Sequence, residues 1–193
     1  MDCTRDTRGN GDYMQPIVID NFIPENEFTE LSTKVMGRYF PWFYYDTIVR
    51  TSDRGKIGHQ YFNMHMLYDN DRPTFTTSWE IMDPVLRKLQ EFKDPNIKME
   101  TLLRVKVNSF PNQGKLIEHG MHRDYAFPSV GCLFGINTCN GYTRIGDKKI
   151  DSVANRAILF DPSTDHSSTS TTNDTRRVNI NFNYLNCQGN IFK

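Results

Sequence analysis

The chain lacks the features that mark membrane proteins, disulfide scaffolds and nucleic-acid-binding proteins. Its 193 residues include four cysteines and carry a formal net charge of zero. No apolar run approaches the roughly 20 residues that span a bilayer, and the polar N-terminus has no apolar signal-peptide core. No CxxC pair and no internal repeat is present. We therefore expect one cytoplasmic domain over residues 1–193, with no membrane partner and with nucleic acid disfavoured as a partner.

The cysteines are too few and too scattered for a disulfide framework. They are Cys3, Cys132, Cys139 and Cys187. Free buried thiols in a reducing compartment are the expected state, and a Cys132–Cys139 disulfide is the alternative.

Hydrophobic periodicity predicts two helices and several short strands. A polar stretch over 1–15 predicts a loose tail. Pro24 opens a helix that ends near Gly37, and apolar spacing of three and four residues predicts a second helix over 77–92. Strands are expected at 16–22, 42–49, 60–67, 102–110, 130–138, 155–160 and 177–184. This order is typical of a mainly β sandwich or barrel with flanking helices.

The chemistry is carried by a His-x-Asp pair, His122 and Asp124, and by His166, which lies 44 positions after His122. Residues two apart in a strand point to the same side, so the pair would project together. His166 follows the strand that ends at Phe160, where a side chain reaches across to a neighbouring strand. Two imidazoles and one carboxylate form the facial triad of non-haem iron(II) oxygenases.

Other histidines compete for this role. His119 offers an HxxH spacing with His122, but that spacing suits a helix, and the following residues 125–128 are not helical. His59 and His65 have no carboxylate at ligand spacing and are interpreted as ordinary surface or core histidines. The sequence therefore favours His122, Asp124 and His166 as catalytic metal ligands.

A strict alternation over 176–185 separates an apolar face from a polar one. Arg177 opens the polar face, which continues with Asn179, Asn181 and Asn183. Because asparagine is a poor strand former, this run suits a polar interior better than a solvated surface. The planar fork of Arg177 is able to hold a carboxylate through two parallel hydrogen bonds. Arg176 points the other way and ranks second.

In this order, His122-Arg123-Asp124, His166 and Arg177 resemble the Fe(II)- and 2-oxoglutarate-dependent dioxygenases, and the prolyl-hydroxylase-like branch in particular. The resemblance runs from about Leu102 to Leu185 and includes residues 134–143 and 155–161. The ending Asn181-Phe182-Asn183-Tyr184 is similar to that of small phage-encoded members.

The resemblance implies a double-stranded β-helix, or jelly roll, with residues 102–185 as its core. It implies iron(II) on His122, Asp124 and His166, and 2-oxoglutarate with its far carboxylate on Arg177. Dioxygen would be the second co-substrate, and ascorbate is a candidate accessory cofactor. The implied reaction couples decarboxylation of 2-oxoglutarate to succinate with hydroxylation of a C–H bond.

The chain departs from the family where several members carry a tyrosine that contacts the co-substrate. Phe110 occupies the matching position and has no hydroxyl, so we expect Asn108, on the same face, to bind the co-substrate instead.

The branch suggests a prolyl residue in a peptide or protein as substrate, although small molecules are also oxidised in the family. A non-catalytic jelly-roll module that binds sugar or protein, with Trp42, Tyr44 and Tyr45 as contacts, is the alternative function. A jelly-roll metalloenzyme that does not use 2-oxoglutarate is the third. The segments 39–68 and 123–129 are the expected substrate walls. The sequence predicts no oligomeric state.

Overall fold

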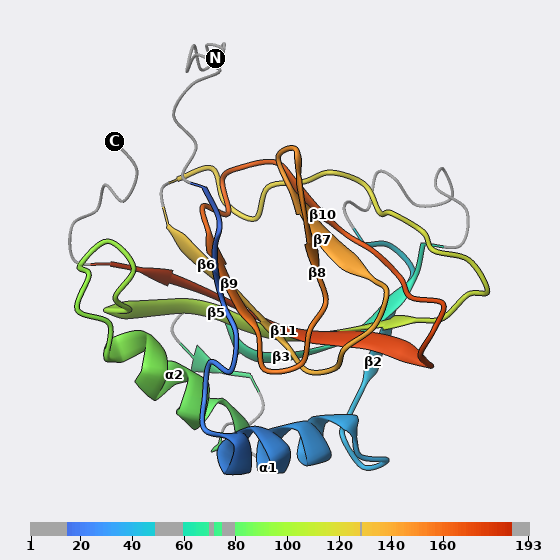
Figure 1. The fold of residues 1–193 in the computed structure, drawn as a ribbon, viewed down its shortest axis with the longest axis horizontal. Coiled ribbons are helices and arrows are strands. Elements are labelled where there is room, and N and C mark those ends of the chain that lie inside the picture. The colour runs from blue at the N-terminus through green and yellow to red at the C-terminus, as the bar shows by residue number, and fades with distance from the viewer. Residues whose placement is uncertain (1–14, 49–59, 70–71, 75–79, 128, 187–193) are drawn as a thin grey trace.

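A computed structural model describes residues 15–48, 60–69, 72–74, 80–127 and 129–186. Two antiparallel sheets face each other, and two helices cover the outer side of the larger sheet (Figure 1). The expected tail over 1–15 lies almost wholly outside the described residues, as do Cys3, His59 and Cys187.

The larger sheet has eight strands, and β11 lies near its middle. Its spatial order is β1 (Ile17–Ile19), β9 (Ala157–Phe160), β6 (Val130–Gly135), β11 (Arg176–Leu185), β5 (Thr101–Pro111), β3 (Phe62–Asp69) and β2 (Phe43–Tyr45), with β4 (Arg72–Pro73) paired to β3. The smaller sheet has the order β10 (His166–Ser168), β7 (Tyr142–Ile145) and β8 (Lys148–Asp151). The expected mainly β, jelly-roll fold is confirmed.

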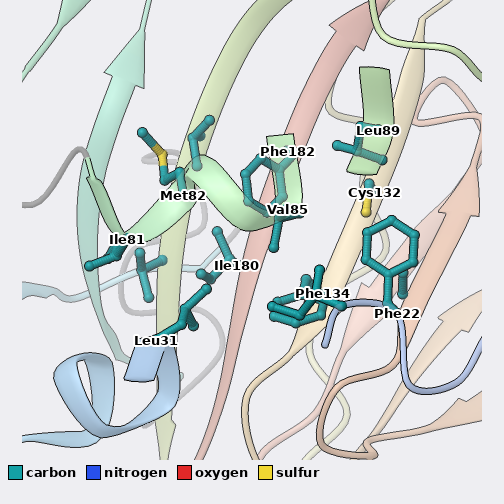
Figure 2. Packing of buried hydrophobic residues seen from close by; sticks show 14 of the residues in the cluster. Phe22, Leu31, Ile81, Met82, Val85, Leu89, Cys132, Phe134, Ile180 and Phe182 are labelled. Atoms are coloured by element: carbon teal, nitrogen blue, oxygen red, sulfur yellow. The ribbon is translucent and has the colours of Figure 1, made fainter. Parts of the chain in front are cut away.

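The main hydrophobic core lies between the larger sheet and the helices α1 (Glu25–Met36) and α2 (Asp83–Gln90). Figure 2 shows Leu31 of α1 and Val85 and Leu89 of α2 directed at Ile180, Phe182 and neighbouring sheet residues. Phe182 and Leu89 are fully buried. The apolar face of β11 therefore faces the helices, and its polar face is left to the space between the sheets.

Helix α1 follows the sequence signals closely. Pro24 stands at its N-cap, two glutamates lie in the first turn, and Phe28, Leu31 and Val35 form the buried stripe. Glutamates near the N-terminus and Lys34 near the C-terminus complement the helix dipole. Gly37 caps the end, as expected.

Helix α2 begins later than the sequence pattern suggests. Residues 80–82 form a 3₁₀ turn before Asp83, and 77–79 lie outside the described residues. Pro84 is in the first turn of α2. Its ring cannot accept a full α-helical turn before it, which accounts for the start of α2 at Asp83.

The predicted strands exist, with shifted ends, and the smaller sheet was missed. The strand expected at 42–49 is three residues long, Phe43–Tyr45. The strands of the smaller sheet are three or four residues long, and two of them consist mainly of polar residues. No alternation of apolar and polar residues therefore predicts them. Cys132 and Cys139 are free and buried, which excludes the alternative disulfide. Among the described residues, no helix has the length and apolar character needed to cross a membrane.

Candidate metal centre

The structure brings together the three side chains expected to bind a metal. One ligand atom each of His122, Asp124 and His166 lies within 4.8 Å of the others. The Nε2 atoms of His122 and His166 are both 4.0 Å from the Asp124 carboxylate, each from a different oxygen. His166 begins β10, at a strand end as expected.

The His-x-Asp pair does not lie on a regular strand, which corrects the expected local structure. His122 forms an isolated β-bridge with His166, and each donates its backbone N–H to the carbonyl of the other at 2.9 Å. The backbone N–H of Asp124 donates to the carbonyl of Pro162 at 2.9 Å. This antiparallel pairing replaces the strand and still directs both side chains to the same side.

Both ligand imidazoles are oriented through their second ring nitrogen. Nδ1 of His122 lies 3.3 Å from the carbonyl oxygen of Gly120, and Nδ1 of His166 lies 2.9 Å from that of Thr164. A proton on Nδ1 that is shared with a carbonyl leaves the Nε2 lone pair free, which is the arrangement metal-binding histidines use. The donor set and its orientation therefore fit a divalent metal ion.

The Asp124 carboxylate is held by donors on both oxygens. Arg104 lies 2.9 Å from Oδ1, while the side-chain amides of Asn181 and Asn183 donate to Oδ2 at 2.9 and 3.2 Å. Burial raises the pKa of Asp124, but the charges of Arg104 and Lys106 outweigh burial and keep that pKa below its usual range. Asp124 is therefore a fixed, ionised candidate ligand.

The pKa of His122 is lowered to about 4, by burial first and by the nearby His166 second. His122 is consequently neutral at physiological pH, as a metal ligand must be.

Arg177 is fully enclosed behind this centre. Its side chain is 1% exposed, and its two Nη atoms donate to the Thr143 hydroxyl at 2.6 Å and the Thr169 carbonyl at 3.3 Å. Its Nε has no hydrogen-bond partner, and no carboxylate of the described residues pairs with it. A Cβ at Gly141 would lie 2.7 Å from Cδ of Arg177, so glycine is needed there to seat the arginine.

The polar face of β11 is buried, as the asparagine run predicted. Asn179, Asn181 and Asn183 are each at most 6% exposed. Arg176 points to the opposite side, where it donates to the carbonyl of Met36 and stacks on Trp42.

A pocket opens between the sheets beside the triad, and Asn108, Phe110, His122, His166 and Asn179 are among its lining residues. Asn108 donates to the Asn179 side chain at 2.9 Å, and its own Oδ1 is buried without a partner. Phe110 is in register with Arg177 on the neighbouring strand, and the guanidinium carbon lies 5.8 Å from its ring centre. Asn108 and Phe110 thus line the pocket on the stretch of β5 that leads from the partner of Asn181 to the partner of Arg177.

The other two histidines that the structure describes, His119 and His65, are outside the triad. His119 is buried beside Phe110, with Nδ1 2.8 Å from the Ser168 hydroxyl and with Nε2 unpaired. Burial and the Arg177 charge lower the pKa of His119 to about 3. His65 is also buried, and its Nδ1 lies 2.7 Å from the carbonyl of Pro41.

Sequence reasoning missed two basic residues on β5. Arg104 binds the metal-site carboxylate, and Lys106 lines the pocket. Their signal was the alternation Arg104, Lys106, Asn108 on one face of a predicted strand, which matches the polar face of β11 residue for residue.

Solved structures of other proteins share the fold of this chain. No family model matches the chain, and no curated protein matches its sequence. A prolyl hydroxylase from Trichoplax adhaerens, solved with a peptide of hypoxia inducible factor, has a TM-score of 0.62 and 16% identity; the match covers 90% of this chain and 84% of that one. An oxidoreductase of the 2-oxoglutarate-Fe(II) oxygenase family from Burkholderia pseudomallei has a TM-score of 0.62 and 11% identity, over 90% and 88% of the two chains.

A collagen prolyl hydroxylase from Paramecium bursaria Chlorella virus-1, solved with 2-oxoglutarate, has a TM-score of 0.58 and 13% identity, over 89% of this chain and 97% of that one. At these identities the shared property is the jelly-roll fold.

Proposed function

We propose that this chain is an Fe(II)- and 2-oxoglutarate-dependent hydroxylase, which couples decarboxylation of 2-oxoglutarate to succinate with hydroxylation of a C–H bond. The observation that carries the proposal is the convergence of two oriented Nε2 atoms and one fixed carboxylate at a pocket wall. Iron(II) held there would supply the activation of dioxygen that side chains cannot provide.

Arg177 supports 2-oxoglutarate as the co-substrate. A guanidinium buried without an acidic partner is costly, because it has lost its water and gained no opposite charge. The far carboxylate of 2-oxoglutarate would supply that charge and accept from the fork, with Thr143 as a second donor. Asn108 remains our candidate for a further contact to the co-substrate.

The substrate we propose, in line with the prolyl hydroxylases that share the fold, is a prolyl residue of a peptide or a small molecule that resembles it. The apolar residues Phe62, Leu133 and Phe160 of the pocket would pack against the ring and keep water away from the reacting carbon.

The test is succinate formation from 2-oxoglutarate by the purified chain with added iron(II), under air and without a prime substrate. The wild-type protein should release succinate, and His122→Ala should not. Asp165→Asn is the matched control, since Asp165 is an exposed carboxylate next to His166 that pairs with Arg123 outside the triad. Equal consumption of 2-oxoglutarate by the wild type and His122→Ala would refute the assignment.

A further inference from the structure

We propose that Lys106 binds a carboxylate of the substrate, so that the preferred substrate is a carboxylic acid and not its neutral counterpart. Lys106 lines the same pocket as the two candidate histidine ligands, and its Nζ lies 5.9 Å from the ring centre of Phe62, another lining residue. It forms no hydrogen bond and no ion pair with any described residue. The inference rests on the proposed function, because it names the substrate of that site.

Lys106 forms no contact ion pair with a described residue: the Asp124 charge raises the pKa of Lys106, but the ion pair of Asp124 is with Arg104. Among the described residues that line the pocket there is no carboxylate, and Asp124 of the metal centre is already bound by Arg104 at 2.9 Å. The far carboxylate of 2-oxoglutarate would pair with Arg177, and its keto-acid end would bind the metal. Among the described residues that line the pocket, Lys106 is therefore the one lysine or arginine, and its partner would come from a further ligand.

The position of Lys106 separates it from the co-substrate end of the pocket. It is paired in register with Asn181, which holds the metal-site carboxylate, whereas Arg177 is paired with Phe110, four residues further along β5. Four strand residues span about 13 Å. Lys106 is thus at the end of β5 near the metal ligands, on the side away from Arg177.

The surroundings of Lys106 favour a singly charged carboxylate over a phosphate. Apolar side chains, Ile48, Phe62, Leu133 and Phe160, form much of the pocket wall. An ammonium beside such a wall is poorly hydrated, and burial lowers the pKa of Lys106 to about 8, which still leaves it mostly charged at pH 7. One available cation matches one negative charge, whereas a phosphate dianion would need additional donors.

The test compares acids with neutral analogues of the same shape. Free L-amino acids, L-proline included, and their carboxamides are titrated by calorimetry into the anaerobic complex of the protein with iron(II) and 2-oxoglutarate. Proline-terminated dipeptides with a free or an amidated C-terminus form a second arm, and phosphoserine forms a third. The first two arms distinguish a free acid from a peptide terminus as the source of the carboxylate.

For at least one acid the wild type should bind the acid about tenfold or more tightly than the amide, which is the size of one charge-assisted hydrogen bond. Lys106→Met should abolish that ratio, and Lys106→Arg should retain most of it. Lys148→Met, which removes an exposed lysine on β8, is the matched control and should keep the wild-type ratio.

Three results would overturn the inference. One is an acid-to-amide ratio near one for every probe, and another is a ratio that Lys106→Met leaves unchanged. The third is a larger effect of Lys106→Met on 2-oxoglutarate binding than on the acid-to-amide ratio, since Lys106 would then hold the co-substrate. Failure of the wild type to form the complex with iron(II) and 2-oxoglutarate would instead refute the proposed function, and this is measured separately before any acid is added.

Discussion

The two faces of β11 are equally buried but serve different purposes. On the outer face, Val178, Ile180 and Phe182 are fully buried against the helices. On the inner face, Arg177, Asn179, Asn181 and Asn183 are buried between the sheets and hold the candidate centre. Burial of the apolar residues stabilises the fold. Burial of the polar residues costs their hydration, and only hydrogen bonds to specific partners compensate for that cost.

Burial alone therefore does not identify a structural residue in this chain. A buried polar residue whose partners are incomplete, such as Arg177, indicates a ligand. We therefore expect outer-face substitutions to change stability, and inner-face substitutions to change ligand binding.

Phe182→Ala should lower the free energy of unfolding by about 3–5 kcal/mol, because it removes a ring from the closed outer core. Urea unfolding of the metal-free protein measures the change. Phe182→Leu keeps most of the volume and should cost less than about 1.5 kcal/mol. Weaker metal binding at unchanged stability would contradict the division between the faces.

Arg177→Met should raise the dissociation constant of 2-oxoglutarate about 100-fold, because a bidentate charge-assisted contact, worth about 3 kcal/mol, is removed. The ligand-free protein should keep or gain stability, since an unpaired buried charge is replaced by an apolar side chain. Anaerobic titration with iron(II) present measures the first effect, and urea unfolding the second. Arg176→Met, on the outer face, is the control and should bind 2-oxoglutarate as the wild type does.

Asn183→Ala should weaken iron(II) binding about 10- to 100-fold, the usual effect of losing a residue that orients a ligand. The lost contact is the amide donation to Asp124. Competition with a chelator of known affinity gives the change. Asn186→Ala serves as control, because Asn186 follows β11 and donates to Asn96, away from the centre. Equal loss in both variants would indicate a general structural effect.

His119→Gln should reduce the sensitivity of the metal-free protein to acid. The pKa of His119 is about 3 in the folded protein and about 6.5 in the unfolded chain. Between these values the unfolded chain binds a proton that the folded chain excludes. The free energy of unfolding therefore decreases as the pH is lowered, by up to about 1.4 kcal/mol per pH unit. Above pH 6.5 this group contributes nothing.

Urea unfolding between pH 7 and 4 would show a shallower decline for His119→Gln than for the wild type. The outer-face variant Phe182→Leu should keep the wild-type slope, as it carries no titrating group. Parallel curves for His119→Gln and the wild type would show that His119 does not stay neutral in the fold.

The sequence predicted most of the inner face but not the way it is assembled. The alternation of apolar and polar residues on β11 predicted both of its faces, and the two histidines and the aspartate predicted the candidate metal centre. The pairing of His122 with His166 was not predictable, because it is a single backbone bridge between a loop residue and the first residue of β10 and leaves no periodic pattern. Likewise, the polar strands β8 and β10 are too short to show alternation.

Arg104 and Lys106 were missed for a different reason. A lysine or an arginine on a strand is read as solvated by default, and only the residue-by-residue pairing with Asn183 and Asn181 shows that both face the interior. The same pairing explains why Phe110 lies beside Arg177. Register between distant strands is therefore the information that a single sequence does not contain.

The bridge between His122 and His166 also bears on the order of assembly. Because two backbone hydrogen bonds fix these residues to each other, the spacing of the imidazoles is set by the folded chain and does not require an ion. The apoprotein should accordingly fold first and take up its metal afterwards. We expect chelated protein to keep its circular dichroism spectrum and to be reconstituted by simple addition of iron(II), without refolding.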